Sequence, residues 1–424
     1  MNTTKPILAT IVAVSLISGL TAAYAQTTNN QTQAVQNAQN EAKIWIGAWI
    51  ASQQPAYGTT PDAISLVGFN NQTVRMIINP KASGSEMRIR LSNLYGTQPL
   101  TIGKVTVAIA GEGASTVSNT SKEITFGGES TVTIPPGAEF LSDAIPFEVT
   151  DDENLAVSVY VPAATGPTTW HRLSNQTTYI STEGDHTADS SADSFTASTT
   201  GWFWLSGIDV VPTAEKKSRV IVVLGDSITD GHLSTLDANH RWPDFLDDRL
   251  DEELPDQTIS VLNAGISGNR ILRDAPMYGV NALARLNRDV LSQTGVTDVI
   301  LLEGINDIGQ SPNVHDADQM IAGMKQIAEQ AHAKGVKIYV GTLSPFRGYR
   351  AGYFTEEGER TRQEVNAWIR NNDVFDGVID FDKALSDPDN PDTMLPSYDG
   401  GDHLHPGDEG YKAMADAVDL NLFK

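Results

Sequence analysis

The 424-residue sequence contains no cysteine. This absence excludes disulfide bonds, a cysteine nucleophile, thiolate ligands for a metal and lipid attachment through a cysteine. Basic residues are also few, because 29 Lys and Arg stand against 53 Asp and Glu, which gives a formal net charge of -24. Such an excess of negative charge opposes binding to nucleic acid or to anionic lipid head groups. The charge by itself identifies no substrate.

Long apolar stretches are scarce as well. One stretch, from Ile7 to Leu20, follows Lys5 and precedes the small residues around Ala25. It is short for a membrane span, and its surroundings are typical of a secretory signal cleaved after Ala25. We therefore expect residues 1–25 to be a signal peptide, and residues 26–41, rich in Gln, Asn and Thr, to be a flexible leader. The mature protein is expected to be exported, to a periplasm or outside the cell, and to have no transmembrane segment.

The length predicts two domains, because single cores rarely grow this large. In residues 42–211, short runs with alternating apolar and polar residues are separated by Gly, Pro and Asn. This pattern predicts an antiparallel β-sandwich of jelly-roll type, with no helix needed to account for it. The clearest runs are Met87–Leu91, Val105–Ile109, Thr131–Ile134 and Leu155–Tyr160.

Two aromatic stretches in this region each allow two interpretations. Trp170-His171 either helps to line a cleft shared by the two domains or is a structural pair at a strand end. Trp202-Phe203-Trp204 either presents a platform for a carbohydrate or acyl group or packs in a core or between domains.

Residues 212–218 read as a linker, and strand and helix patterns alternate from residue 219 to residue 424. Continuous apolar runs predict strands buried on both faces, and the repeated βα order predicts a three-layer α/β/α parallel sheet. We expect helices to begin at Trp242 and near Asp408, the latter running to Leu422, and two others with apolar faces at 283–291 and 320–331. The predicted strands are 220–224, 259–262, 298–302, 337–343 and 378–381.

Polar motifs follow three of these strands. Gly225-Asp226-Ser227 ends the first, Ser267-Gly268-Asn269 follows the second and Gly304-Ile305-Asn306-Asp307 follows the third. A fourth motif, Asp402-His403-Leu404-His405, precedes the last helix. Ligands of open α/β sheets bind outside the carboxyl ends of the strands, so we expect these motifs to meet there.

In this order, the four motifs resemble blocks I, II, III and V of the SGNH (GDSL) hydrolase family. The β-rich region is similar to the N-terminal β-domain of longer members through Gln72–Arg75, Arg88–Asn93 and Thr125–Gly128. The resemblance implies a flavodoxin-like catalytic domain with a Ser227, His405 and Asp402 triad. It further implies that Ser227, Gly268 and Asn306 form the oxyanion hole, and that neither a cofactor nor a metal is used. Glu303, in front of block III, departs mildly from the family pattern.

The chemistry requires these residue types. A serine hydroxyl needs a base within reach, and a carboxylate must hold the imidazole in the correct tautomer. Asp402, three residues before His405, is able to fold back to it. His403 competes for this role, but the family's histidine is the third residue after the Asp and is followed by Pro406. An alternative interpretation is that Asp402, His403 and His405 bind a metal ion.

The absence of a Gly-x-Ser-x-Gly elbow argues against an ordinary α/β-hydrolase. The resemblance implies an exported serine carboxylic-ester hydrolase that forms an acyl-enzyme on Ser227. Its substrates would be small-molecule or polysaccharide esters, with short-chain or carbohydrate-linked esters expected. The alternatives are a lipase or phospholipase-type acylhydrolase, a glycan- or envelope-binding protein with an inactive SGNH-like domain, and a metal-dependent phosphoesterase. The sequence leaves the oligomeric state open.

Overall fold

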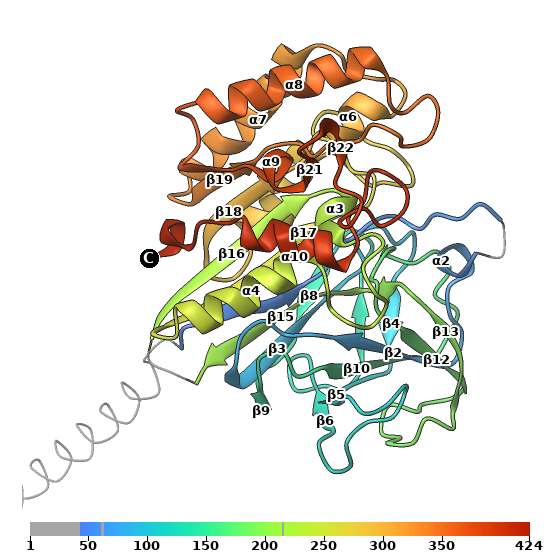
Figure 1. Cartoon of the computed structure of the whole chain (residues 1–424). Helices are drawn as coiled ribbons and strands as arrows, with labels where there is room; N and C mark the ends of the chain where they lie inside the picture. The colour runs from blue at the N-terminus through green and yellow to red at the C-terminus, as the bar shows by residue number, and fades with distance from the viewer. Residues whose placement is uncertain (1–42, 61–62, 214–215) are drawn as a thin grey trace, which may run out of the picture. The chain divides into compact units, whose positions relative to one another are not determined.

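The computed structural model describes residues 43–60, 63–213 and 216–424. The predicted signal peptide and leader lie outside these residues, as do positions 214–215 of the predicted linker. Residues Trp45–Lys424 form one compact unit (Figure 1). Within it, residues 45–213 are built from antiparallel strands and residues 216–424 surround a parallel sheet. We refer to these as the sandwich half and the α/β half. Their division into separate domains at residues 212–218 stays a prediction.

The sandwich half contains two antiparallel sheets. Their strand orders are β13-β12-β2-β10-β5-β6 and β1-β15-β3-β8, with β9 also paired to β3. The bounds are β1 (Ile46–Ile50), β2 (Gln72–Ile78), β3 (Gly84–Ser92), β5 (Lys104–Ile109), β6 (Lys122–Ile124), β8 (Glu139–Leu141), β9 (Ile145–Val149), β10 (Leu155–Val161), β12 (Thr178–Glu183), β13 (Phe195–Thr199) and β15 (Leu205–Pro212). The short strands β4 (Leu100–Ile102) and β7 (Val132–Ile134) pair separately, as do β11 (Trp170–His171) and β14 (Trp202–Phe203).

One expectation for this half is wrong, because a single helical turn, α2 (Ile64–Val67), interrupts the strands. The turn ends at Gly68, whose φ of +74° suits glycine. The alternation of β3 behaves as predicted: Met87, Ile89 and Leu91 are fully buried, while Arg88 and Arg90 point to Asp209 on the opposite face.

The aromatic stretch Trp202-Phe203-Trp204 packs in the core. These side chains are 6%, 0% and 1% exposed. Trp202 contacts the ring of Trp49 edge-on at 4.9 Å between centroids, and Phe203 contacts Phe69 at 4.8 Å. The interpretation as a ligand platform is therefore wrong, because the rings are already covered by protein.

The α/β half is built on a five-stranded parallel sheet of order β17-β16-β18-β19-β20. The residues Val220–Leu224 of β16 are fully buried, as a central strand covered on both faces requires. Figure 1 shows α4 and α10 on one side of this sheet and α7 and α8 on the other, which confirms the predicted three layers. The strands are β16 (Lys217–Gly225), β17 (Gln257–Gly265), β18 (Val296–Leu302), β19 (Lys337–Gly341) and β20 (Gly377–Ile379).

The short helices α3 and α6 directly follow β16 and β18, and longer helices cover the two faces of the sheet. The helices are α3 (Ser227–Asp230), α4 (Trp242–Glu253), α5 (Ala282–Leu286), α6 (Ile305–Gly309), α7 (Ala317–His332), α8 (Glu356–Asn371), α9 (Phe381–Leu385) and α10 (Asp408–Asp416), with a π-helical turn η1 (Asn287–Leu291) and a hairpin of β21 (Ser386–Asp387) and β22 (Asn390–Met394). The last helix was predicted to run to Leu422, and this prediction is wrong. It ends at Asp416, and a separate 3₁₀ turn, η2 (Leu420–Phe423), begins where the Asp419 carboxylate accepts a hydrogen bond from Asn421.

The two halves contact each other through β1 and β17. The N–H of Gly47 donates to the Thr294 carbonyl at 2.8 Å. A Cβ on Gly47 would lie 2.7 Å from Leu262 Cδ1, so a larger residue here would require the Leu262 side chain to move. Among the described residues, no helix is both long enough and apolar enough to span a bilayer.

Candidate active site

Ser227 begins α3 directly after β16 ends at Gly225. The side chain of Asp226 accepts a hydrogen bond from the Ile228 N–H at 3.0 Å and so caps the helix. A Cβ on Gly225 would lie 2.2 Å from Thr229 Oγ1, so a larger residue would disturb this turn. Gly231, with a φ of +91°, ends the helix after one turn. The serine is thereby held at the carboxyl end of the central strand.

Three side chains predicted to act together lie in one hydrogen-bonded chain. Ser227 Oγ is 2.8 Å from His405 Nε2, and His405 Nδ1 is 2.7 Å from Asp402 Oδ2. The N–H groups of Leu404 and His405 donate to the other oxygen of Asp402. Burial raises the pKa of Asp402, but the hydrogen bond and charge of His405 outweigh this effect and lower it to about 2. Asp402 is therefore ionised throughout the physiological range and orients the imidazole.

His403 lies outside this chain. Its φ is +68°, and its Nδ1 is 2.6 Å from Asp399 Oδ2, so the ring turns away from Ser227. The predicted metal set of Asp402, His403 and His405 is therefore not brought together. The set of possible metal ligands contains His232 in place of His403, because ligand atoms of His232, Asp402 and His405 all lie within 4.8 Å of one another.

His232 is a site residue that the sequence reasoning missed. Its ring meets the ring of His405 edge-on, with centroids 4.5 Å apart. Burial and the neighbouring His405 lower the pKa of His232. The available signal was its position, directly after the Gly231 that ends the nucleophile's helix.

Of the predicted oxyanion residues, Gly268 lies in the turn after β17. Gly268 has a φ of +81° in a turn closed by a hydrogen bond of 2.9 Å from Asn269 N–H to the Ile266 carbonyl. A Cβ there would lie 2.2 Å from the Tyr278 ring. Both the conformation and the space therefore require glycine.

Asn306, in α6, is held by three partners. Its Nδ2 donates to Asp226 Oδ2 at 3.2 Å, and its Oδ1 accepts from Gln310 Nε2 at 2.7 Å and from the Tyr353 hydroxyl at 2.9 Å. Because two donors face Oδ1, the orientation of the amide is determined. Tyr353 and Gln310 were not identified from the sequence.

A buried charged cluster lies beneath these loops. The Arg285 guanidinium donates to the carbonyls of Gly225 at 2.9 Å and Ala264 at 2.7 Å, and so joins the ends of β16 and β17. Its Nη2 is 3.8 Å from Glu303 Oε2. Burial, followed by the charge of Asp226, raises the pKa of Glu303 well above its usual value. Burial also raises the pKa of Asp226 to about 7.

Ser227, Gly268, Asn306 and His405 line one cleft of about 520 Å³. The sandwich half supplies part of its wall, including Tyr57, Trp170 and Arg172. Trp170 is thus a cleft residue, as one of the two interpretations held. His171 is 2% exposed and lies behind the wall.

Residues 223–413 match the model of the GDSL-like lipase/acylhydrolase family. No curated protein matches the chain. Similar solved structures include a GDSL-like lipase from Bacteroides thetaiotaomicron, with 18% identity, 48% of this chain and 87% of that chain covered, and a TM-score of 0.36. A carbohydrate acetylesterase from Sinorhizobium meliloti shares 19% identity over 47% of this chain and 95% of its own, with a TM-score of 0.37. An aryl esterase from M. smegmatis shares 18% identity over 47% and 95%, with a TM-score of 0.39.

Proposed function

We propose that this chain, whose residues 223–413 match the model of the GDSL-like lipase/acylhydrolase family, is an exported serine carboxylic-ester hydrolase that acts through an acyl-enzyme on Ser227. The observation that carries this proposal is the hydrogen-bonded series from Ser227 Oγ to His405 to Asp402, with distances of 2.8 and 2.7 Å. The apolar run from Ile7 to Leu20, which is followed by a polar leader at residues 26–41, supports export.

In the first half of the reaction, Ser227 Oγ attacks the ester carbonyl carbon while His405 Nε2 takes the hydroxyl proton. The ionised Asp402 stabilises the imidazolium that forms. His405 then gives its proton to the departing alcohol oxygen as the carbon–oxygen bond breaks. In the second half, water attacks the acyl-enzyme, His405 accepts a proton from it, and this proton returns to Ser227 Oγ as the acid leaves.

Backbone donors support the assignment of the oxyanion hole. Within the described part of the chain, the N–H groups of Ser227 and Gly268 have no protein acceptor, although both residues are buried and line the cleft. Unpaired buried N–H groups are rare in native proteins, so these two are available to a developing negative charge. The Asn306 amide adds a third donor.

The walls of the cleft bear on the substrate class. Tyr57, Trp170, Tyr278 and Tyr349 provide aromatic surface beside polar groups, a lining suited to short acyl groups and sugar rings. Among its described lining residues two are arginines, Arg172 and Arg350, and none is Asp or Glu. A positive cleft on a protein of net charge -24 favours an anionic substrate. We therefore rank acetylated pectin, a polymer of uronic acids, above acetylated xylan.

The test is covalent labelling with a fluorophosphonate, followed by assays on p-nitrophenyl esters of increasing acyl length and on both polysaccharides. Labelling of Ser227 by the probe, and loss of ester cleavage in Ser227→Ala, are expected. An unlabelled wild-type protein, together with unchanged cleavage in Ser227→Ala, would show that the serine is not the nucleophile. A preference for long acyl chains would favour the lipase alternative, and retention on polysaccharide without turnover would favour a binding protein.

The cluster of His232, Asp402 and His405 gives a metal-dependent hydrolase as a second candidate. A chelator distinguishes the two candidates. The serine mechanism predicts unchanged turnover in the presence of EDTA, whereas a metal-dependent reaction would be lost and restored by added Zn²⁺.

A further inference from the structure

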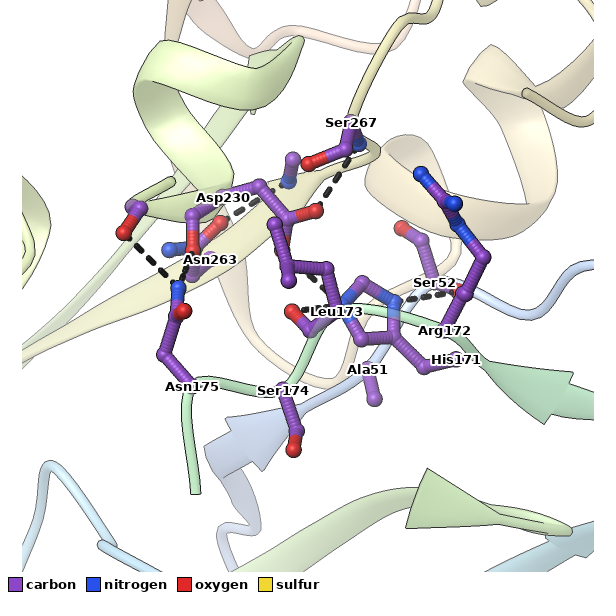
Figure 2. Close-up of polar contacts among 12 residues, drawn as sticks. Ala51, Ser52, His171, Arg172, Leu173, Ser174, Asn175, Asp230, Asn263 and Ser267 are labelled. Atoms are coloured by element: carbon purple, nitrogen blue, oxygen red, sulfur yellow. Dashed lines mark hydrogen bonds and ion pairs between the residues drawn. The ribbon is translucent and has the colours of Figure 1, made fainter. Parts of the chain in front are cut away.

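A buried histidine of the sandwich half contacts the helix that carries Ser227. His171 ends β11 and is 2% exposed. Its Nε2 lies 2.9 Å from Oδ1 of Asp230, the last residue of α3 and itself 4% exposed (Figure 2). This contact connects the two halves directly behind the candidate active site.

Both ring nitrogens of His171 face oxygen atoms. Nδ1 is 2.9 Å from the Ser52 carbonyl, and Nε2 is also 3.1 Å from the Leu173 carbonyl. A carbonyl only accepts hydrogen bonds, so both contacts are satisfied together when the two nitrogens both carry hydrogen, that is, when the ring is a cation. Burial by itself lowers the pKa of His171, but Asp230 and the two carbonyls raise it overall. Among the described residues, Asp230 is the acidic side chain that contacts this ring.

The second oxygen of Asp230 holds the loop of the predicted oxyanion hole. Oδ2 accepts a hydrogen bond of 2.8 Å from the Ser267 N–H (Figure 2). Ser267 immediately precedes Gly268 in the turn closed by Asn269, so this bond fixes the peptide next to the one that carries the Gly268 N–H. The backbones are in close contact here, since a Cβ on Gly265 would lie 2.4 Å from Asp230 N.

A buried ion pair is weak evidence for a stabilising role, because well-packed apolar residues often serve stability equally well. Here both partners also make hydrogen bonds in specific directions. We propose that His171 is a positioning residue, whose ring holds the Asp230 carboxylate aimed at Ser267, so that the Gly268 N–H faces the oxyanion. The sandwich half would then be part of the catalytic apparatus. This inference rests on the proposed serine-esterase function.

The test uses His171→Gln in the full chain, with kcat and KM measured from pH 5 to pH 10. Deleting an oxyanion donor lowers kcat by a factor of roughly 10²–10³, and a misplaced donor should lower it by less. We therefore expect kcat to fall about 10- to 100-fold while KM changes little. In the wild type, activity should decline as the pH rises through the raised pKa of His171, because the cation is lost. The variant should lack this alkaline decline.

The buried pair Arg219–Asp298 provides a matched control. It lies near the amino ends of β16 and β18, with side chains 8% and 0% exposed and 2.7 Å between its charged atoms. Arg219→Gln also removes one partner of a buried pair, so it should lower stability while leaving kcat and the pH profile unchanged. If His171→Gln does not fold, the double variant His171→Gln/Asp230→Asn leaves no unpaired buried charge. It should fold, with a reduced kcat and no alkaline decline.

A folded His171→Gln with the kcat and pH profile of the wild type would overturn the proposal. So would ¹⁵N chemical shifts showing a neutral His171 ring in the wild type at pH 7, a measurement that needs no variant. Ser227→Ala, assayed in parallel, separates the two levels of inference. Full activity in Ser227→Ala refutes the serine mechanism itself, whereas an inactive Ser227→Ala beside a normal His171→Gln refutes only the positioning role.

Discussion

Asn306 shows how one side chain is given a single orientation. Its carbonyl oxygen accepts from Gln310 and Tyr353, and its amide nitrogen faces Asp226. We expect Asn306→Ala to fold but to lose about 10²–10³ in kcat, roughly 3–4 kcal/mol of transition-state stabilisation. Steady-state kinetics on a p-nitrophenyl ester measure the loss. Asn313→Ala, which removes an amide bonded to the Ile308 carbonyl at 2.6 Å, is the control and should retain its kcat.

Glu303, the departure from the family pattern, gives a prediction about pH. It is 1% exposed, and neither side-chain oxygen has a hydrogen-bond partner among the described residues. Burial and Asp226 raise the pKa of Glu303 in the folded state above the value of 4.5 expected when unfolded. A raised pKa gives stability that is present below pH 4.5 and lost as the pH rises.

Glu303→Gln keeps the shape of the side chain and cannot ionise. Its free energy of unfolding should therefore equal that of the wild type near pH 4 and exceed it increasingly at higher pH, by at most about 1.4 kcal/mol per pH unit. Urea denaturation at several pH values measures the difference. Glu329→Gln, an exposed change on α7, should show no such trend. A constant difference for Glu303→Gln across the pH range would contradict the prediction.

At the scale of elements, the turn after β17 requires glycine for its positive φ and for the space that a Cβ would need. Two variants distinguish these two requirements. Gly268 has a φ of +81° and would place a Cβ 2.2 Å from Tyr278, whereas Gly137 has a φ of +80° and nothing within 4 Å. Both Gly→Ala changes should cost about 1 kcal/mol in stability from backbone strain. Only Gly268→Ala should also lower kcat, by tenfold or more, because the turn must shift to relieve the collision. Equal kcat values in the two variants would show that the turn does not position a donor.

The elements that the sequence predicted are those with local signals. The continuous apolar run of β16 identifies a buried parallel strand, and the spacing of Asp402 and His405 places both on one turn. Arg285 and Tyr353 could not be found in this way, because each reaches the site from a distant segment and its partners are backbone carbonyls or another loop. The end of α10 was missed because Val418 and Leu422 continue an apolar helical pattern across the break made by Asp419.

At the scale of the whole molecule, polar contacts join the two halves at several points. Arg90 Nη2 donates to Gln293 Oε1 at 2.7 Å, Arg285 Nη1 to Ser52 Oγ at 3.3 Å, and Arg241 Nη2 to the Ser174 carbonyl at 2.5 Å. Together with the contact of β1 and β17, these place both halves in one compact unit. The cleft depends on this arrangement, because its walls come from both halves.

This arrangement predicts that the halves unfold together, although the sequence predicts two domains. Five of the seven tryptophans, Trp45, Trp49, Trp170, Trp202 and Trp204, belong to the sandwich half, so fluorescence reports mainly on that half, while fluorophosphonate labelling of Ser227 reports on the other. In urea, both signals should change at one midpoint, as expected for a cooperative transition. Arg90→Ala, which removes the contact with Gln293, should move both midpoints downward together. Two separated midpoints in the wild type would instead show that the halves are independently stable domains, and that the cleft is lost when either one unfolds.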